Sequence, residues 1–211
     1  MPDFLLDGPE DAATTILLAH GAGAPMDSPA MASVAKALAG QGLRVARFEF
    51  GYMAARRTGG RRPVPRAERV MPEYVAAVAA LAAPGRLVIG GKSMGGRVAS
   101  MVADGLNAQG KVAGLLCLGY PFHPPGRPGQ HRTAHLERLA TPALICQGTR
   151  DPFGTREEVA GYALSPRIEM LWLEDGDHDQ RPRKAVSGLT AADHLGTVAA
   201  RVAAWAGGLG G

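Results

Sequence analysis

Short apolar runs alternate along this chain with longer segments of helical periodicity, and this alternation is the strongest constraint on its fold. The apolar runs cover residues 15–19, 45–50, 87–90, 112–118, 143–147 and 169–173. Runs that lack polar alternation are typical of strands buried on both faces of a parallel sheet. We therefore expect each run to form a buried strand.

The intervals between the runs carry apolar residues at the spacing of an α-helix. Helices are expected over residues 29–40, 67–83, 94–106, 156–163 and 191–205, and Ser28 and Pro29 open the first of them. This repetition predicts an α/β fold: a doubly wound, mostly parallel sheet of about six to seven strands with helices on both faces. Such sheets bind ligands beyond the carboxyl ends of their strands, so the residues that follow each run are the place to look for function.

Length and composition fit one globular unit. A chain of 211 residues is expected to form a single domain over residues 1–211, as a monomer or weak homodimer. No apolar run is long enough to span a membrane, and the first residues do not resemble a signal peptide. Cys117 and Cys146 lie inside apolar runs, which favours core thiols, no disulfide framework and a cytoplasmic location.

A Gly-x-Ser-x-Gly motif stands between the third run and the helix that follows it. Residues 91–95 read Gly-Lys-Ser-Met-Gly, and this context places Ser93 on a sharp turn at the amino end of a helix. Ser93 is therefore a candidate nucleophile. The same residues resemble the end of a phosphate-binding P-loop, but that motif needs a glycine where Arg86 stands.

Small residues follow the first run, from His20 onwards. A backbone N–H in this loop, together with that of Met94, can form an oxyanion hole, although an ordinary glycine turn is the alternative. We assign the loop donor to Ala22, with Gly23 as the second choice, and expect His20 to brace the loop. A dinucleotide-binding fingerprint is disfavoured because Met26 replaces its third glycine.

An aspartate and a histidine follow the last two runs. Asp151 comes after the fifth run and His178 after the sixth, which gives the chain order serine, aspartate, histidine that α/β-hydrolase triads have. Asp175 and Asp177 are too close to His178 in sequence to meet its ring edge well. No second histidine stands at metal-ligand spacing, so we expect neither a metal nor a cofactor.

Basic residues are concentrated over residues 56–66, in a chain whose net charge is +4. The stretch contains Arg56, Arg57, Arg61, Arg62 and Arg66. It is either a solvated loop or a guanidinium cluster that binds a phosphate or carboxylate. Nucleic-acid binding is not expected because no aromatic residues alternate with these arginines.

Taken together, these motifs resemble the dienelactone-hydrolase-like α/β-hydrolases. More narrowly, the sequence is similar to the small lidless hydrolase-like domain found in many bacterial proteins and in an animal chromatin-complex subunit. The resemblance extends from residues 17–23 to His178 and includes residues 47–53, 91–97, 119–126 and 147–154. It implies a triad of Ser93, Asp151 and His178. It also implies a fold without a cap domain, because only a Pro- and His-rich loop follows the fourth run.

The sequence therefore predicts a serine hydrolase that cleaves a small ester or thioester. His178 would accept the proton of Ser93, and Asp151 would orient the imidazole. Apolar side chains near the strand ends are expected to bind a small acyl or aryl group: Met26, Tyr52, Met53, Phe122 and Phe153. Two alternatives stay open: acyl transfer or thioester hydrolysis with an anionic carrier held by residues 56–66, and a binding or scaffold module without turnover.

Overall fold

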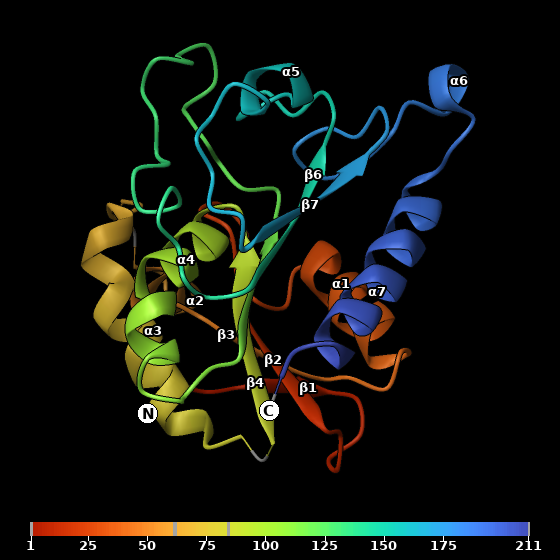
Figure 1. The fold of residues 1–211 in the computed structure, drawn as a ribbon. Coiled ribbons are helices and arrows are strands. Elements are labelled where there is room, and N and C mark those ends of the chain that lie inside the picture. Colours follow the sequence, from red (N-terminus) through yellow and green to blue (C-terminus); the bar gives the residue numbers. More distant parts are fainter. Residues whose placement is uncertain (1, 61–62, 84, 211) are drawn as a thin grey trace.

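The computed structural model describes residues 2–60, 63–83 and 85–210, and its described strands form one seven-stranded sheet (Figure 1). The strand order is β1-β3-β2-β4-β5-β6-β7. Only β1 runs antiparallel to its neighbour; the other pairs are parallel. The strands are β1 (Leu5–Asp7), β2 (Thr14–Ala19), β3 (Arg44–Phe48), β4 (Arg86–Lys92), β5 (Gly114–Leu118), β6 (Ala143–Gly148) and β7 (Ile168–Leu173). This confirms the expected α/β fold with a mostly parallel sheet.

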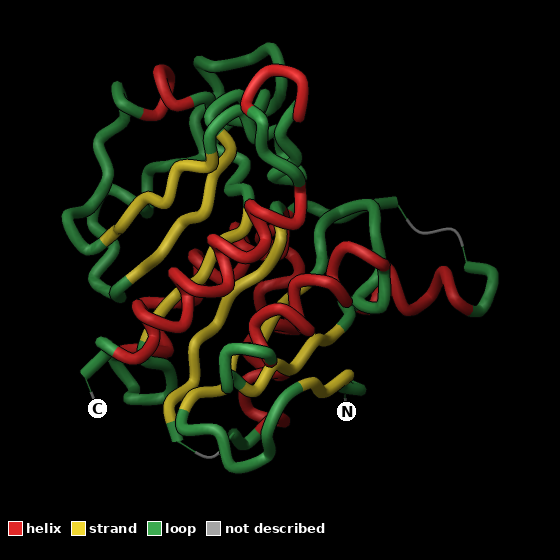
Figure 2. Tube along the Cα trace, turned by 90° about the vertical axis from the view of Figure 1, so that its right-hand side faces the viewer, coloured by secondary structure: helices red, strands yellow, loops and turns green. Residues whose placement is uncertain are grey.

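Helices cover both faces of the sheet. Helices α2, α3 and α4 lie on one face and α1 and α7 on the other, as Figure 1 shows. Figure 2 views the sheet from the side of α1 and α7, with the strands side by side behind them. The helices are α1 (Pro29–Ala39), α2 (Gly51–Arg57), α3 (Ala67–Leu81), α4 (Met94–Asn107), α5 (Arg156–Val159), α6 (Lys184–Ser187) and α7 (Ala191–Gly207).

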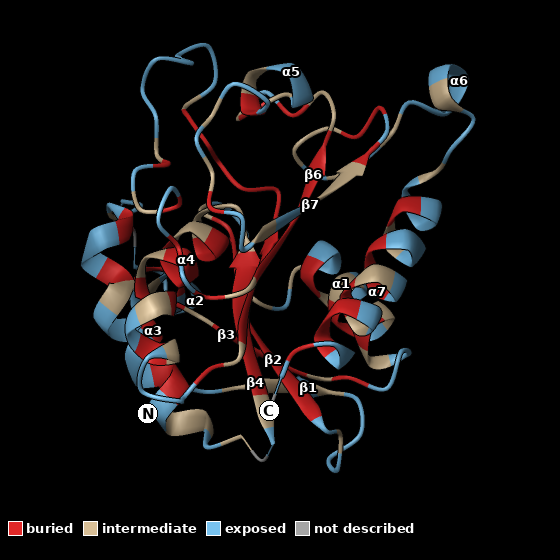
Figure 3. Cartoon of the chain, in the orientation of Figure 1, coloured by how far each residue is buried: buried red, intermediate tan, exposed pale blue. Residues whose placement is uncertain are grey.

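The sheet separates two hydrophobic clusters because successive side chains of a strand point to opposite faces. In β2, Leu17 and Ala19 pack with α3 and α4, whereas Ile16 and Leu18 pack with α1 and α7. All four are fully buried, and buried residues run along the central strands in Figure 3. Burial on both faces explains why these strands read as uninterrupted apolar runs.

The strand order reverses at β2. The chain leaves β2 through α1 to reach β3 on one side, and it then crosses the other face through α3 to reach β4 on the opposite side. The crossovers therefore diverge at the carboxyl ends of β2 and β4, which is where doubly wound sheets open a crevice for ligands.

Several short elements differ from the sequence expectation. Strand β1 was not expected, because three residues on a sheet edge carry no periodic signal. Helix α2 begins directly after Phe50, so the predicted strand over 45–50 ends at Phe48, and Arg56 and Arg57 lie in a helix. The strand expected over 112–118 begins at Gly114, and α5 stops at Val159, well before residue 163. Residues 119–142, all described, form a loop between β5 and β6 without a cap helix.

Candidate active site

Ser93 occupies a strained turn between β4 and α4. Its backbone has φ +51°, a region that residues with a Cβ rarely adopt. A Cβ at Gly91 would lie 2.4 Å from the Ala19 carbonyl oxygen, and a Cβ at Gly95 would lie equally close to the same atom. Both positions therefore require glycine, and together they bring Ser93 against the end of β2.

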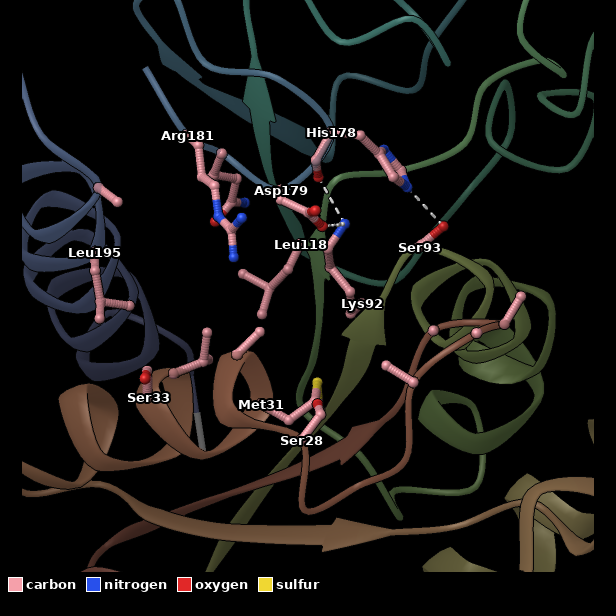
Figure 4. Close-up of a pocket in the computed structure, with 18 of the residues that line it drawn as sticks. Ser28, Met31, Ser33, Lys92, Ser93, Leu118, His178, Asp179, Arg181 and Leu195 are labelled. Atoms are coloured by element: carbon pink, nitrogen blue, oxygen red, sulfur yellow. Dashed lines mark hydrogen bonds and ion pairs between the residues drawn. The ribbon is translucent and has the colours of Figure 1, made fainter. Parts of the chain in front are cut away.

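Asp151, His178 and Ser93 form one hydrogen-bonded chain, although they follow three different strands. His178 Nδ1 lies 2.8 Å from Asp151 Oδ2, and His178 Nε2 lies 2.8 Å from Ser93 Oγ. A carboxylate only accepts hydrogen bonds, so Nδ1 carries a hydrogen and donates a hydrogen bond to Asp151. Nε2 of the neutral ring is then the acceptor for the Ser93 hydroxyl. Figure 4 shows the contact between His178 and Ser93.

Asp151 is completely buried, so its charge depends on donors around it. Gln147 Nε2 donates to Oδ2 over 2.9 Å, and the Phe153 amide donates to Oδ1 over 2.8 Å. The Phe153 ring also packs on the His178 imidazole, with 4.1 Å between ring centroids. The carboxylate and the imidazole are therefore held in place from several sides.

His20 fixes the loop that follows β2. It is buried, and burial lowers the pKa of its imidazole. Its Nδ1 contacts the Gly21 carbonyl at 2.6 Å, and its Nε2 accepts a hydrogen bond from the Phe50 amide over 3.1 Å. A neutral imidazole satisfies both contacts, because Nδ1 donates a hydrogen bond and Nε2 accepts one. The expectation that His20 braces this loop is confirmed.

Tyr52 sets the direction of the peptide groups in the same loop. Its hydroxyl lies 3.4 Å from the Gly21 carbonyl and 3.1 Å from the Ala22 carbonyl. In a trans peptide the N–H points away from the preceding C=O, so the amides of Ala22 and Gly23 point away from Tyr52. Neither amide has a hydrogen-bond acceptor within the described ranges. The Met94 N–H opens α4, where a helix leaves its first donors unsatisfied.

A cavity of about 640 Å³ extends from Ser93 and His178 to the first turns of α1 and α7 (Figure 4). Its volume is within the range of small-molecule sites. Helices α1 and α7 contribute the apolar lining residues Ala30, Met31, Val34, Ala191, Ala192 and Leu195, and Leu118 adds another next to Ser93. The loop after β2 contributes Gly21, Ala22, Gly23 and Ala24, and the polar lining includes Ser28, Lys92, Asp179 and Arg181.

Of the five side chains expected to bind substrate, the structure places only Phe153 on this cavity. Tyr52, Met53 and Phe122 are buried in the core on the opposite face of the sheet. Met26 faces another hollow, and its backbone is bound by Glu49 and Arg47. Closeness to a strand end in sequence does not determine the face to which a side chain points, and this is why the other four side chains do not line this cavity. No sequence pattern indicates that residues of α1 and α7 line the cavity, because this depends on how the two helices pack.

The arginine stretch does not reach this cavity where it is described. Arg57 pairs with Glu49 at 2.7 Å and with Asp27 at 2.8 Å. Arg56 lies over the Tyr52 ring, 5.6 Å from its centroid. Arg61 and Arg62 lie outside the described residues. The cations that line the cavity are instead Lys92 and Arg181.

Comparison with known proteins gives a consistent result. The family model for the alpha/beta hydrolase domain matches residues 12–207. An α/β serine hydrolase without a lid from Xanthomonas campestris aligns with TM-score 0.72 at 19% identity, over 97% of this chain and 89% of that one. Dienelactone hydrolase from Anabaena variabilis aligns with TM-score 0.71 at 21% identity, over 98% and 91% of the two chains. At this identity the two structures are evidence for the shared fold.

Over residues 2–60, 63–83 and 85–210, the helices are all too short or too polar to cross a bilayer.

Proposed function

Because the chain belongs to the alpha/beta hydrolase domain family, we propose that it is a serine hydrolase that cleaves a small carboxylic ester or thioester through an acyl-enzyme on Ser93. The observation that carries this proposal is the chain of 2.8 Å contacts from Asp151 through His178 to Ser93. A serine hydroxyl is a weak nucleophile until a base accepts its proton, and this geometry supplies the base.

The first half of the reaction forms the acyl-enzyme. Ser93 Oγ attacks the acyl carbon while its proton moves to His178 Nε2, and Asp151 stabilises the resulting imidazolium. The amides of Ala22 and Met94 would bind the negatively charged oxygen of the tetrahedral intermediate. His178 then gives the proton to the departing alkoxide or thiolate as the carbon–oxygen or carbon–sulfur bond breaks.

The second half releases the acid. Water loses a proton to His178 Nε2 and attacks the acyl carbon, and the Ser93 ester bond breaks as the proton returns to Ser93 Oγ. Ala22 stays our assignment for the loop donor, since Tyr52 turns the Ala22 amide away from itself and Ala22 lines the cavity, although these contacts do not separate it from Gly23. Gly23 has the same properties and stays the second choice.

The cavity wall supports an apolar acyl or alcohol group. Its far end is formed by small and aliphatic side chains from α1 and α7, a lining that suits an alkyl or aryl group better than a sugar.

A cytoplasmic location is part of the proposal. Cys117 and Cys146 are both free thiols, the state in which a reducing compartment keeps cysteines.

Initial rates with p-nitrophenyl acetate, p-nitrophenyl butyrate and a butyryl thioester test the proposal. We expect turnover by the native protein and a loss of about 10³-fold or more in kcat for Ser93→Ala. Ser187→Ala is the matched control, because this serine lies in α6 and outside the cavity lining. Turnover that survives Ser93→Ala would refute an acyl-enzyme on Ser93.

A further inference from the structure

Lys92 is a mostly buried cation directly before the proposed nucleophile. Its side chain is 19% exposed, and burial lowers the pKa of its ammonium, against the opposite influence of Asp179. A buried charge is costly unless it is paired and hydrogen-bonded. The mechanism above gives this charge no role in the chemistry, so its partners are the guide to what it does.

The partners of Lys92 belong to the loop that carries His178. Its Nζ donates to the His178 carbonyl over 2.6 Å and lies 3.4 Å from Asp179 Oδ1, and both contacts are drawn in Figure 4. The turn between β4 and α4 that carries Ser93 is thus joined directly to the backbone of His178. The two groups that must exchange a proton are linked through this second contact as well as through their side chains.

The space for this contact is provided by Gly119, at the end of β5. A Cβ there would lie 2.8 Å from the His178 carbonyl oxygen and 3.1 Å from Lys92 Nζ. Gly119 also has φ +65°, which suits glycine. The end of β4, the residue after β5 and the loop after β7 therefore meet around one lysine–carbonyl hydrogen bond.

The rest of the loop is fastened on either side of His178. Asp175 is bound by Arg150 and Arg183 at one end. Gln180 donates to the Cys146 carbonyl over 3.0 Å at the other. Between these anchors, the hydrogen bond from Lys92 is what holds the main chain of His178 itself, within the described part of the molecule.

We propose that Lys92 is a positioning residue for His178, whose carbonyl it holds so that the imidazole stays between Asp151 and Ser93. The proposal rests on the proposed hydrolase function. Displacement of a reacting group by about 1 Å can cost roughly 100-fold in rate, so a lost tether lowers kcat while substrate binding changes little. A lysine that bound substrate would instead raise KM when removed.

The experiment compares Lys92→Met, Lys92→Gln and Lys92→Arg with p-nitrophenyl acetate as substrate. We expect Lys92→Met to lower kcat about 10- to 100-fold with little change in KM, and Lys92→Arg to restore most of kcat. Lys92→Gln keeps an N–H donor and should retain more activity than Lys92→Met. Lys111→Met is the matched control, since Lys111 is exposed and lies outside the cavity lining.

A second readout does not depend on turnover. Hydrogen–deuterium exchange of residues 174–183 should be faster in Lys92→Met than in the native protein. If Lys92→Met does not fold, Lys92→Gln takes its place and should also exchange faster than the native protein. A raised KM with unchanged kcat, or unchanged kcat together with unchanged exchange, would overturn the proposal. If the native protein cleaves no ester, the hydrolase proposal fails by itself, and the exchange comparison still decides whether Lys92 holds the His178 loop.

Discussion

At the residue scale, each side chain of the proposed triad is held by partners that take no part in the reaction. Gln147 and the Phe153 amide hold Asp151, and Phe153 packs on His178. Ser93 keeps an unfavourable φ because glycines on both sides let the turn pack against β2. The side chains of the proposed triad are consequently held in one arrangement by the protein itself, which is the preorganisation that electrostatic catalysis requires.

Asp175 fastens the start of the His178 loop by charge. Arg183 hydrogen-bonds this carboxylate, and together with Arg150 it lowers the Asp175 pKa to about 2. A carboxyl with a lowered pKa stabilises the fold above its unfolded-state pKa, and this contribution is lost as the pH falls through the folded-state value.

We therefore expect Asp175→Asn to lower Tm at neutral pH, with a gap to the native protein that narrows as the pH falls from about 4 to about 2. Thermal unfolding across this pH range measures the gap. Asp3→Asn, on the amino-terminal segment outside this loop, is the control. A gap that is constant with pH would show that the ion pair does not fasten the loop.

At the element scale, the first turns of α1 and α7 form the far wall of the cavity. Ala30 and Met31 come from α1, and Ala191, Ala192 and Leu195 come from α7. The sequence does not predict that α1 and α7 line the cavity together. It specifies the two helices, but not that they pack against each other on one face of the sheet. Tertiary packing rather than local pattern thus determines which groups the site can accept.

Filling this wall should shorten the chains that the protein accepts. Each buried methylene contributes about 0.8 kcal/mol, so kcat/KM of the native protein should rise about three- to fourfold per methylene from acetyl to hexanoyl esters. Ala192→Phe should remove this rise and leave acetyl ester hydrolysis nearly intact. Series of p-nitrophenyl acyl esters and of alkyl acetates measure which side of the ester enters the cavity.

The matched control for this series is Ala200→Phe, which makes the same change on the exposed side of α7. It should keep the native chain-length profile. An unchanged profile in Ala192→Phe, in both ester series, would mean that the substrate does not extend towards α7.

At the scale of the whole molecule, the site is a consequence of sheet topology. Residues 93, 151 and 178 are far apart in the chain, yet each follows one of the parallel strands of the sheet, so all three arrive at the same edge. The buried-strand pattern, the glycines around Ser93 and the order of Asp151 and His178 made this arrangement predictable from the sequence.

Other parts of the molecule were not predictable because they depend on contacts between distant segments. The direction of Tyr52 and Phe122 depends on the sheet face to which they turn, and both are buried away from the cavity. The tether from Lys92 to His178 depends on how the loop after β7 folds over the end of β4. Sequence pattern locates the reacting groups, and packing determines their surroundings.

Intact-mass spectrometry after treatment with a fluorophosphonate tests the central claim most directly, because this electrophile reacts readily with a serine that a neighbouring base activates. We expect one covalent adduct on the native protein and none on Ser93→Ala or His178→Ala. A folded native protein that gains no adduct, or an adduct that persists in Ser93→Ala, would contradict the claim that Ser93 is the activated nucleophile.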